Sequence, residues 1–173
     1  MDALAAFETE RLFIRPFVLS DAASYLPLVS DSQVIRFTAD KPLKSAEEAA
    51  SFLKAHPLRD YALFGYGRMA CIQKSSGDLI GFTGLKYLED MDETDIGYRF
   101  VPAAWGKGYA TESAAAVMEC QPALLGLERV IGLAEPQNSG SVRVLRKLGM
   151  AHERRIADEA HGSLDIYARA FHG

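Results

Sequence analysis

Apolar and polar residues recur with two different periods along the chain, and the change of period separates helices from strands. In the first third, apolar positions at helical spacing predict one helix over residues 20–29 and a second over residues 45–55. Ser45–Glu48 reads as a capping box for the second helix, whereas Pro27 weakens the later part of the first. A short strand at residues 12–15 precedes both helices.

The middle of the chain is dominated by strands, and helices return only in the second half. Ile96, Tyr98 and Phe100 alternate with polar or small residues, which is the period of a strand with one buried face. Two more helices are expected at residues 109–120 and 140–148. Further strands are expected at residues 69–73, 79–87, 94–101, 129–134, 152–156 and 164–170. This order predicts an α+β fold with a mixed, mostly antiparallel sheet of six or seven strands flanked by helices.

The composition describes one globular domain that spans residues 1–173. Hydrophobic residues make up 49% of the chain and charged residues 24%, as in soluble globular proteins. The net charge of −4 gives no electrostatic reason to expect nucleic-acid binding. No apolar run approaches the roughly 18 residues of a membrane span, and the N-terminus does not resemble a signal peptide. The expected location is therefore the cytoplasm, with no membrane partner.

The cysteines and histidines predict neither a disulfide framework nor a metal site. Cys71 and Cys120 lie far apart and belong to no CxxC or Cys/His cluster, so we expect free thiols in a reducing compartment. The four histidines are scattered, without metal partners at a suitable spacing.

The first candidate site is the segment 96–112, in which a strand runs through a glycine-containing turn into a helix. Such a helix start presents unpaired backbone N–H groups and the positive end of the helix dipole, and phosphate groups bind well there. Gly106 and Gly108 would let the backbone approach an anion closely. A P-loop is excluded because Gly108 follows Lys107, and a dinucleotide fingerprint lacks its third glycine. Taken alone, the turn could also be an ordinary strand-to-helix connection.

The second candidate site is the segment 135–150. A strand ends there, Asn138 or Ser139 caps a helix, and Gly149 is suited to the left-handed position just beyond its end. By itself the pattern indicates only a well-capped helix.

Together these segments resemble the GNAT acetyltransferase superfamily, and in particular the branch that includes the ribosomal-protein N-terminal acetyltransferases. The phosphate-turn motif of that branch matches Trp105-Gly-Lys-Gly-Tyr-Ala-Thr-Glu112. Its second motif matches Pro136-Gln-Asn-Ser-Gly-Ser141 and Leu148-Gly-Met150. Similar stretches also occur at residues 8–16, 79–85 and 126–130, so the resemblance covers residues 8–171.

The resemblance implies an acetyl-CoA site in a sheet that splays open between the strands at 94–101 and 129–134. The first of these strands would bond the pantetheine arm through its backbone, and the glycine turn would hold the pyrophosphate. The implied cofactor-binding residues are Phe100, Val101, Trp105, Gly106, Lys107, Gly108, Tyr109, Ala110, Thr111, Asn138 and Ser141. Arg143, Arg146 and Lys147 could lie near the 3′-phosphate, or could form the solvated face of their helix.

Two departures from the family pattern affect the chemistry and the fold. Many members have a tyrosine seven residues after the asparagine as general acid for the leaving thiolate, and here that position is Leu145. Ser141 is the nearest replacement. Pro122 interrupts a helix that is usually longer, so we expect it to end early or to kink.

The implied reaction is direct attack of an amine on the thioester. Asp95 stands where the family often has a glutamate and could take the amine's proton through water, or could be an exposed acid on an alternating strand. Since neither motif contains a cysteine, no covalent enzyme intermediate is expected.

The acceptor cannot be named from the residues. Protein N-termini, free amino acids, polyamines and aminoglycosides all remain open, as does the oligomeric state. The acidic run at residues 89–95 could attract a cationic acceptor, although a solvated loop is the simpler interpretation. The alternatives are transfer of another acyl group, such as succinyl, and a non-catalytic acyl-CoA-binding module.

Overall fold

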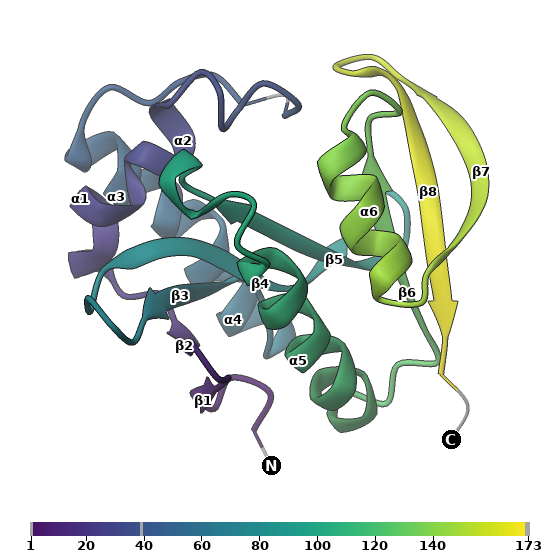
Figure 1. The fold of residues 1–173 in the computed structure, drawn as a ribbon, viewed down its shortest axis with the longest axis horizontal. Coiled ribbons are helices and arrows are strands. Elements are labelled where there is room, and N and C mark those ends of the chain that lie inside the picture. Colours follow the sequence, from purple (N-terminus) through teal and green to yellow (C-terminus); the bar gives the residue numbers. More distant parts are fainter. Residues whose placement is uncertain (1, 39, 172–173) are drawn as a thin grey trace.

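A single mixed β-sheet is the frame of the fold in the computed structural model, which describes residues 2–38 and 40–171 (Figure 1). Its strand order is β1-β2-β3-β4-β5-β6-β8-β7. The strands are β1 (Phe7–Glu8), β2 (Leu12–Pro16), β3 (Met69–Gln73), β4 (Leu79–Leu88), β5 (Glu93–Phe100), β6 (Arg129–Ala134), β7 (Ala151–Asp158) and β8 (Gly162–Ala170). All neighbouring pairs are antiparallel except β5 and β6. The expected α+β fold with a mixed, mostly antiparallel sheet is confirmed.

Within the described residues the sheet has eight strands, so the expectation of six or seven was too low. The additional strand is β1, whose two residues pair with Ile14 and Phe13 of β2. A strand of two residues is too short to show a period of alternation, so the sequence pattern gives no sign of it.

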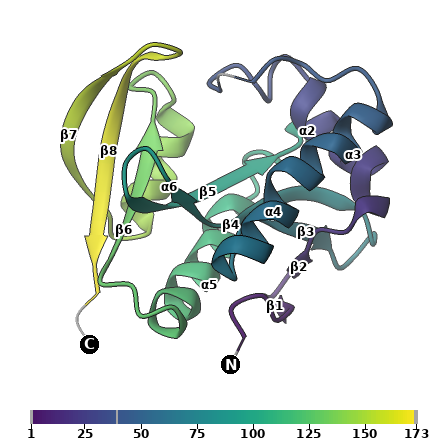
Figure 2. The same ribbon diagram turned by 180° about the vertical axis from the view of Figure 1, so that it is seen from behind.

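Helices cover both faces of this sheet. They are α1 (Ala22–Tyr25), α2 (Pro27–Ser30), α3 (Ala46–Ala55), α4 (Pro57–Phe64), α5 (Tyr109–Leu124) and α6 (Ser139–Lys147), with short 3-10 helices at Leu19–Asp21 and Pro102–Ala104. In Figure 1, α5 and α6 lie in front of the sheet, and Figure 2 shows α3 and α4 over the opposite face. Among the described residues the core forms three buried clusters. One lies beneath α5, one lies between the sheet and α1–α3, and one joins β2 and β3 to the start of α5.

Prolines explain where the helices differ from expectation. The helix predicted over residues 20–29 is divided into a 3-10 turn and two short helices, and α2 begins at Pro27. Proline lacks a backbone N–H and is best tolerated in the first turn of a helix. Pro57 opens α4 in the same way, a helix that the sequence pattern did not predict. The expected capping box is present at Ser45, whose hydroxyl accepts the Glu48 N–H at 3.2 Å.

Helix α5 runs through Pro122 to Leu124, so the expectation that it ends near residue 120 was wrong. Pro122 lies two residues before the end of the helix. Its missing N–H therefore removes one bond near the C-terminus, and its ring is buried against the core.

The sheet opens between β5 and β6, as expected. These strands share a single pair of facing residues, Asp95 and Ile131, although β5 continues to Phe100 and β6 to Ala134. Beyond that pair the strands diverge, and α6 lies beside the opening (Figure 1). The backbone of β5 after Asp95 is therefore free of β6 and faces the gap.

Candidate functional site

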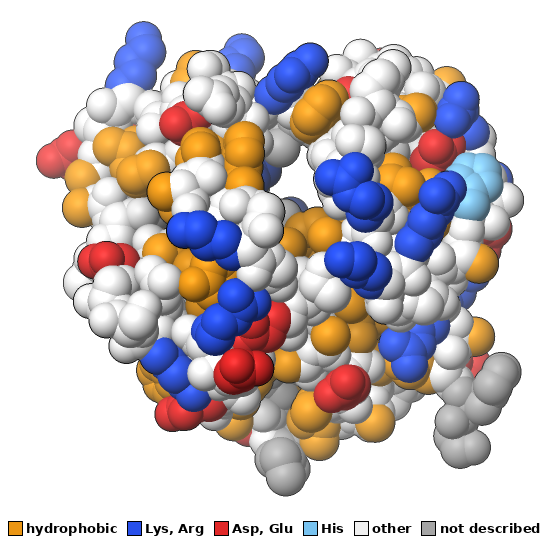
Figure 3. All heavy atoms as spheres, viewed as in Figure 1, with side chains coloured by type: hydrophobic (Ala, Val, Ile, Leu, Met, Phe, Trp, Pro, Cys, Tyr) orange, Lys and Arg blue, Asp and Glu red, His pale blue; other side chains and the backbone are white. Residues whose placement is uncertain are grey.

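A cavity of about 620 Å³ lies at the carboxyl end of β5, between the start of α5, helix α6 and the segment 33–38. Figure 3 shows the hollow near the centre of this face, flanked by Lys and Arg side chains. Most of the residues expected to bind the cofactor line it: Phe100, Trp105, Gly106, Gly108, Tyr109, Ala110, Thr111, Asn138 and Ser141. Val101, Lys107 and Asp95 are not part of its lining.

The cavity lining is positive, although the chain as a whole is acidic. Its charged residues are Arg36, Arg99, Arg143 and Lys147, and among the described residues no carboxylate lines it. Arg99 is neutralised by Asp40, with 2.7 Å between the guanidinium nitrogen and the carboxylate. Within residues 2–38 and 40–171, no acid pairs with the other three cations. Such a lining favours a ligand that carries several negative charges.

The glycine turn before α5 has the backbone shape that an anion site requires. Gly106 and Gly108 have φ angles of +72° and +84°, in the left-handed region that other residues rarely adopt. Gly108 is the N-cap of α5, and no side chain caps the helix there. A Cβ at Gly106 would meet no atom within 4 Å, so the turn is open on that side. The first N–H groups of the helix are therefore available to a ligand in the cavity.

An ion pair that joins distant parts of the chain braces this turn. Arg11 donates to the carbonyl oxygen of Lys107 at 2.8 Å and pairs with Glu112 in the first turn of α5 at 2.6 Å. Glu112 also accepts the Thr9 hydroxyl at 2.6 Å and the Arg11 N–H at 2.9 Å. Burial alone would raise the pKa of Glu112, but these hydrogen bonds outweigh that effect and lower it. Sequence reasoning gave Arg11 and Glu112 no role, although both belong to stretches that carry the family resemblance.

Two backbone groups at the end of β5 are already hydrogen-bonded within the protein. The Trp105 indole N–H donates to the Phe100 carbonyl oxygen at 2.7 Å, and the Val101 N–H donates to Ile80 at 3.0 Å. The Val101 N–H is thus engaged by β4. Because hydrogen-bonding directions alternate along a strand, the N–H groups of Tyr98 and Phe100 point toward the gap instead.

Helix α6 places Ser141 against β5. The Asn138 side chain caps the helix by accepting the Ser141 N–H at 3.1 Å. The Tyr98 hydroxyl donates to the Ser141 carbonyl oxygen at 2.9 Å and lies 3.0 Å from the Ser141 hydroxyl. Leu145, at the position of the family's tyrosine, is buried in the core against Gly132. Sequence reasoning found Ser141 but not Tyr98, which it treated only as part of an alternating strand.

Asp95 lies on the face of β5 opposite to Tyr98, where it forms an ion pair with Arg68. Its carboxylate accepts from Arg68 at 2.6 Å, and the Asp95 side chain is only 10% exposed. The Arg68 side chain reaches it across Gly97, where there is no room for a Cβ. Asp95 is therefore a buried, paired acid rather than an exposed one.

Acids of the run before Asp95 are largely engaged by the surrounding structure. Glu89 pairs with Arg59 at 2.7 Å, and Glu93 pairs with Arg129 at 3.0 Å. None of the acids between residues 89 and 95 lines the cavity. This arrangement favours the interpretation of the run as a solvated, paired hairpin.

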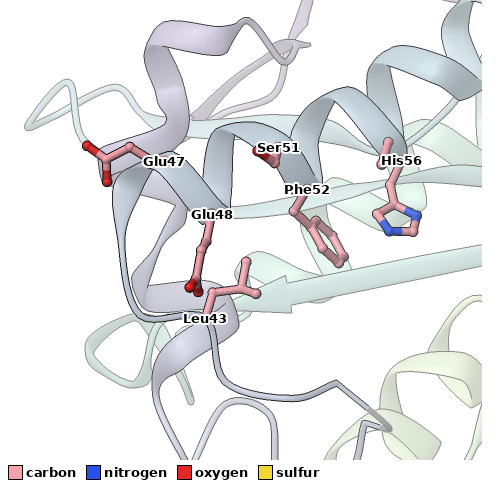
Figure 4. Close-up of a pocket in the computed structure, with 7 residues that line it drawn as sticks. Leu43, Glu47, Glu48, Ser51, Phe52 and His56 are labelled. Carbon is pink, nitrogen blue, oxygen red and sulfur yellow. The ribbon is translucent and has the colours of Figure 1, made fainter.

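A second hollow lies on the outer side of α3, away from these groups. Figure 4 shows Phe52 and His56 along one side of it and Leu43 and Glu48 at its lower end. It shares no lining residue with the cavity at α5. In the part of the chain that the structure describes, no cluster of three His, Cys, Asp or Glu side chains could hold a metal, and no helix has the length and apolar character needed to cross a membrane.

Comparisons with known proteins agree with this geometry. A family model described as "Acetyltransferase (GNAT) domain" matches residues 11–151. The chain is 29% identical over 164 residues to an uncharacterized N-acetyltransferase, p20, from Bacillus licheniformis, covering 92% of this chain and 91% of that protein. A GNAT-family acetyltransferase from Bacillus anthracis shares the fold with a TM-score of 0.81 at 25% identity, covering 96% of this chain and 98% of that one. The ribosomal-protein-S5-alanine acetyltransferase from Vibrio fischeri shares it with a TM-score of 0.74 at 17% identity, covering 96% of each chain.

Proposed function

Because the chain belongs to the GNAT acetyltransferase family, we propose that it transfers the acetyl group of acetyl-CoA to a primary amine in the cavity at the start of α5. The resemblance read from its motifs is thereby confirmed, and the chain is an acyltransferase. The observation that carries the proposal is the open glycine turn at Gly106 and Gly108, facing a cavity whose charged residues are all cations.

The residues present fit this co-substrate. The N–H groups at the start of α5 would hold the pyrophosphate, and Arg143 and Lys147 of α6 lie on the same cavity for the remaining phosphate. The backbone of Tyr98 and Phe100 would bond the pantetheine arm along the gap between β5 and β6. Acetyl-CoA supplies a thioester carbonyl that an amine can attack directly.

Side chains of this protein would accept and donate the protons of that reaction. An ammonium group has a pKa of about 8 to 10.4, so the amine must lose a proton before it attacks. Asp95, which is paired with Arg68 and lies outside the cavity lining, is the proposed base, acting at a distance through water. Ser141 is the proposed donor to the departing sulfur. A backbone N–H of β5 near Phe100 would stabilise the oxyanion.

The reaction requires only a free amino group, so it does not by itself identify the acceptor. A protein N-terminus and a small amine both satisfy the requirement for a free amino group. No acid lines the described cavity, so the lining itself does not select a polycation such as a polyamine. We therefore favour an acceptor with a single amine over a polyamine.

The experiment that tests the function follows thiol release from acetyl-CoA with a panel of amines. The panel contains peptides with free N-termini, amino acids, polyamines and an aminoglycoside, each with acetyl-CoA and with succinyl-CoA. We expect turnover with acetyl-CoA, with at least one single-amine acceptor faster than the polyamines. Tight binding of acetyl-CoA without thiol release from any amine would favour the acyl-CoA-binding module.

Replacing Asp95 by asparagine is expected to have two separable effects. Loss of one partner of a buried ion pair should lower the free energy of unfolding by about 3 kcal/mol, measured by denaturant unfolding. If Asp95 takes the amine's proton, the rate at limiting amine should fall mostly at neutral pH. At high pH it should change little, because free amine is then abundant.

The control for this variant is Asp90→Asn, which removes an exposed acid from the same hairpin. We expect Asp90→Asn to leave both stability and rate unchanged. An Asp95→Asn enzyme with the wild-type rate per folded molecule at every pH would leave Asp95 only its ion pair with Arg68.

A further inference from the structure

The position of Tyr98 suggests a role in the proposed reaction that the sequence pattern did not reveal. Tyr98 and Ser141 come from elements on opposite sides of the opening in the sheet, β5 and α6, and both line the cavity. The tyrosine hydroxyl contacts the serine twice, at its carbonyl oxygen at 2.9 Å and at its hydroxyl at 3.0 Å. These contacts hold the first turn of α6 against β5 at the place where the two strands separate.

We propose that Tyr98 is a positioning residue for Ser141, and that its hydroxyl orients the serine hydroxyl to donate a hydrogen bond to the departing sulfur. This inference rests on the proposed function. It also explains how the departing sulfur receives a hydrogen bond although Leu145 stands at the family's tyrosine position. The phenol is supplied by a strand on the far side of the gap, and it acts through a serine rather than on the sulfur itself.

The environment of Tyr98 suits a group that keeps its proton. Burial raises the pKa of its phenol, and the hydrogen bond with Ser141 only partly offsets that effect. The charged groups that act on it, Asp95 and Arg68, do so in opposite directions. The single proton of such a phenol lies within reach of both the carbonyl oxygen and the hydroxyl of Ser141. When it is shared with the hydroxyl, the serine proton is free to point at the sulfur. Hydrogen bonds in such a chain strengthen one another.

Over the whole step, neither the Tyr98 hydroxyl nor the Ser141 hydroxyl loses a proton. The amine nitrogen forms the C–N bond while the C–S bond breaks and leaves its electron pair on sulfur. The ammonium form of the amine loses two protons in all, of which one ends on the sulfur and the other in solvent. Ser141 stabilises the thiolate until that proton arrives, and Tyr98 holds Ser141 in place.

A binding experiment tests this without turnover. Calorimetry would compare coenzyme A with desulfo-coenzyme A, which lacks the sulfur, at about pH 9.5, where an ordinary thiol with a pKa of about 8.5 is ionised. The wild type should bind coenzyme A more tightly, because hydrogen bonds to ionised groups are the stronger ones. Tyr98→Phe should reduce that preference on the order of tenfold and leave the affinity for desulfo-coenzyme A unchanged.

The matched control is Tyr66→Phe. Tyr66 is also buried, its hydroxyl lies 2.7 Å from that of Thr94, and it does not line the cavity. This variant therefore loses a comparable hydrogen bond elsewhere in the fold. We expect it to retain the full preference for coenzyme A, and equal losses in the two variants would overturn the inference.

Kinetics provide the second test. Tyr98→Phe should lower kcat about tenfold with the KM for acetyl-CoA unchanged, and should add less than about twofold in a Ser141→Ala background. A purely structural role would give the same factor in both backgrounds. Either that outcome, or a wild type that binds coenzyme A and its desulfo analogue equally, overturns the inference. Absence of thiol release by the wild type would instead contradict the proposed function, and the binding experiment would still decide the contact with sulfur.

Discussion

Replacing Gly108 by valine is expected to lower the affinity for acetyl-CoA by on the order of 10²-fold, measured by calorimetry. Gly108 is the N-cap of α5 at a φ of +84°, a conformation that a β-branched residue adopts only with strain. The turn would rearrange and withdraw the N–H groups that we expect to hold the pyrophosphate. Each hydrogen bond to a charged group contributes roughly 1.5–3 kcal/mol, so the loss of two at the lower end of this range accounts for the expected change.

Gly77→Val is the matched control for this variant. Gly77 has a φ of +79° in the turn between β3 and β4, and it is not part of the cavity lining. Both substitutions introduce the same backbone strain, and circular dichroism and thermal unfolding would establish that both variants fold. Unchanged affinity in a folded Gly108→Val protein would show that acetyl-CoA does not use this turn.

Ser141→Ala is expected to lower kcat on the order of 10²-fold, with little change in the KM for acetyl-CoA. Alanine keeps the backbone N–H that bonds to Asn138 and the carbonyl oxygen that accepts the Tyr98 hydroxyl. The substitution therefore removes the serine hydroxyl and leaves the cap of α6 in place. Steady-state kinetics of thiol release would measure the effect.

The control for this substitution is Ser139→Ala on the same helix. Ser139 is exposed and does not line the cavity, so its loss should leave kcat unchanged. Wild-type turnover by Ser141→Ala would assign the stabilisation of the thiolate to another group, and Ser141 would then serve only in the packing of α6 against β5.

The features that the sequence determined by itself are local. The bounds expected for the strands at 69–73 and 129–134 agree with β3 and β6. The glycines of the turn and the cap at Asn138 also have the expected conformations and contacts. Periodicity, capping and the need for glycine at positive φ depend on neighbours in the chain, and so they can be read from the order of residues.

The prolines show that local sequence signals alone do not determine where a helix ends. Pro27 begins a new helix as its chemistry suggests, but Pro122 is accommodated inside α5. The difference lies in the surroundings. Burial of the Pro122 ring against the core supports the last turn of α5, and packing can outweigh local propensity.

Only the tertiary structure decided which side chains meet at the site. Arg11 and Glu112, 101 residues apart, brace the glycine turn, and Tyr98 reaches Ser141 across 43 residues. The divergence of β5 from β6 after a single facing pair opens the gap between them. Such contacts depend on how the sheet and helices pack, and no period along the chain encodes them. The sequence thus determined the family, the elements and the phosphate turn, whereas packing determined the brace behind that turn and the tyrosine beside Ser141.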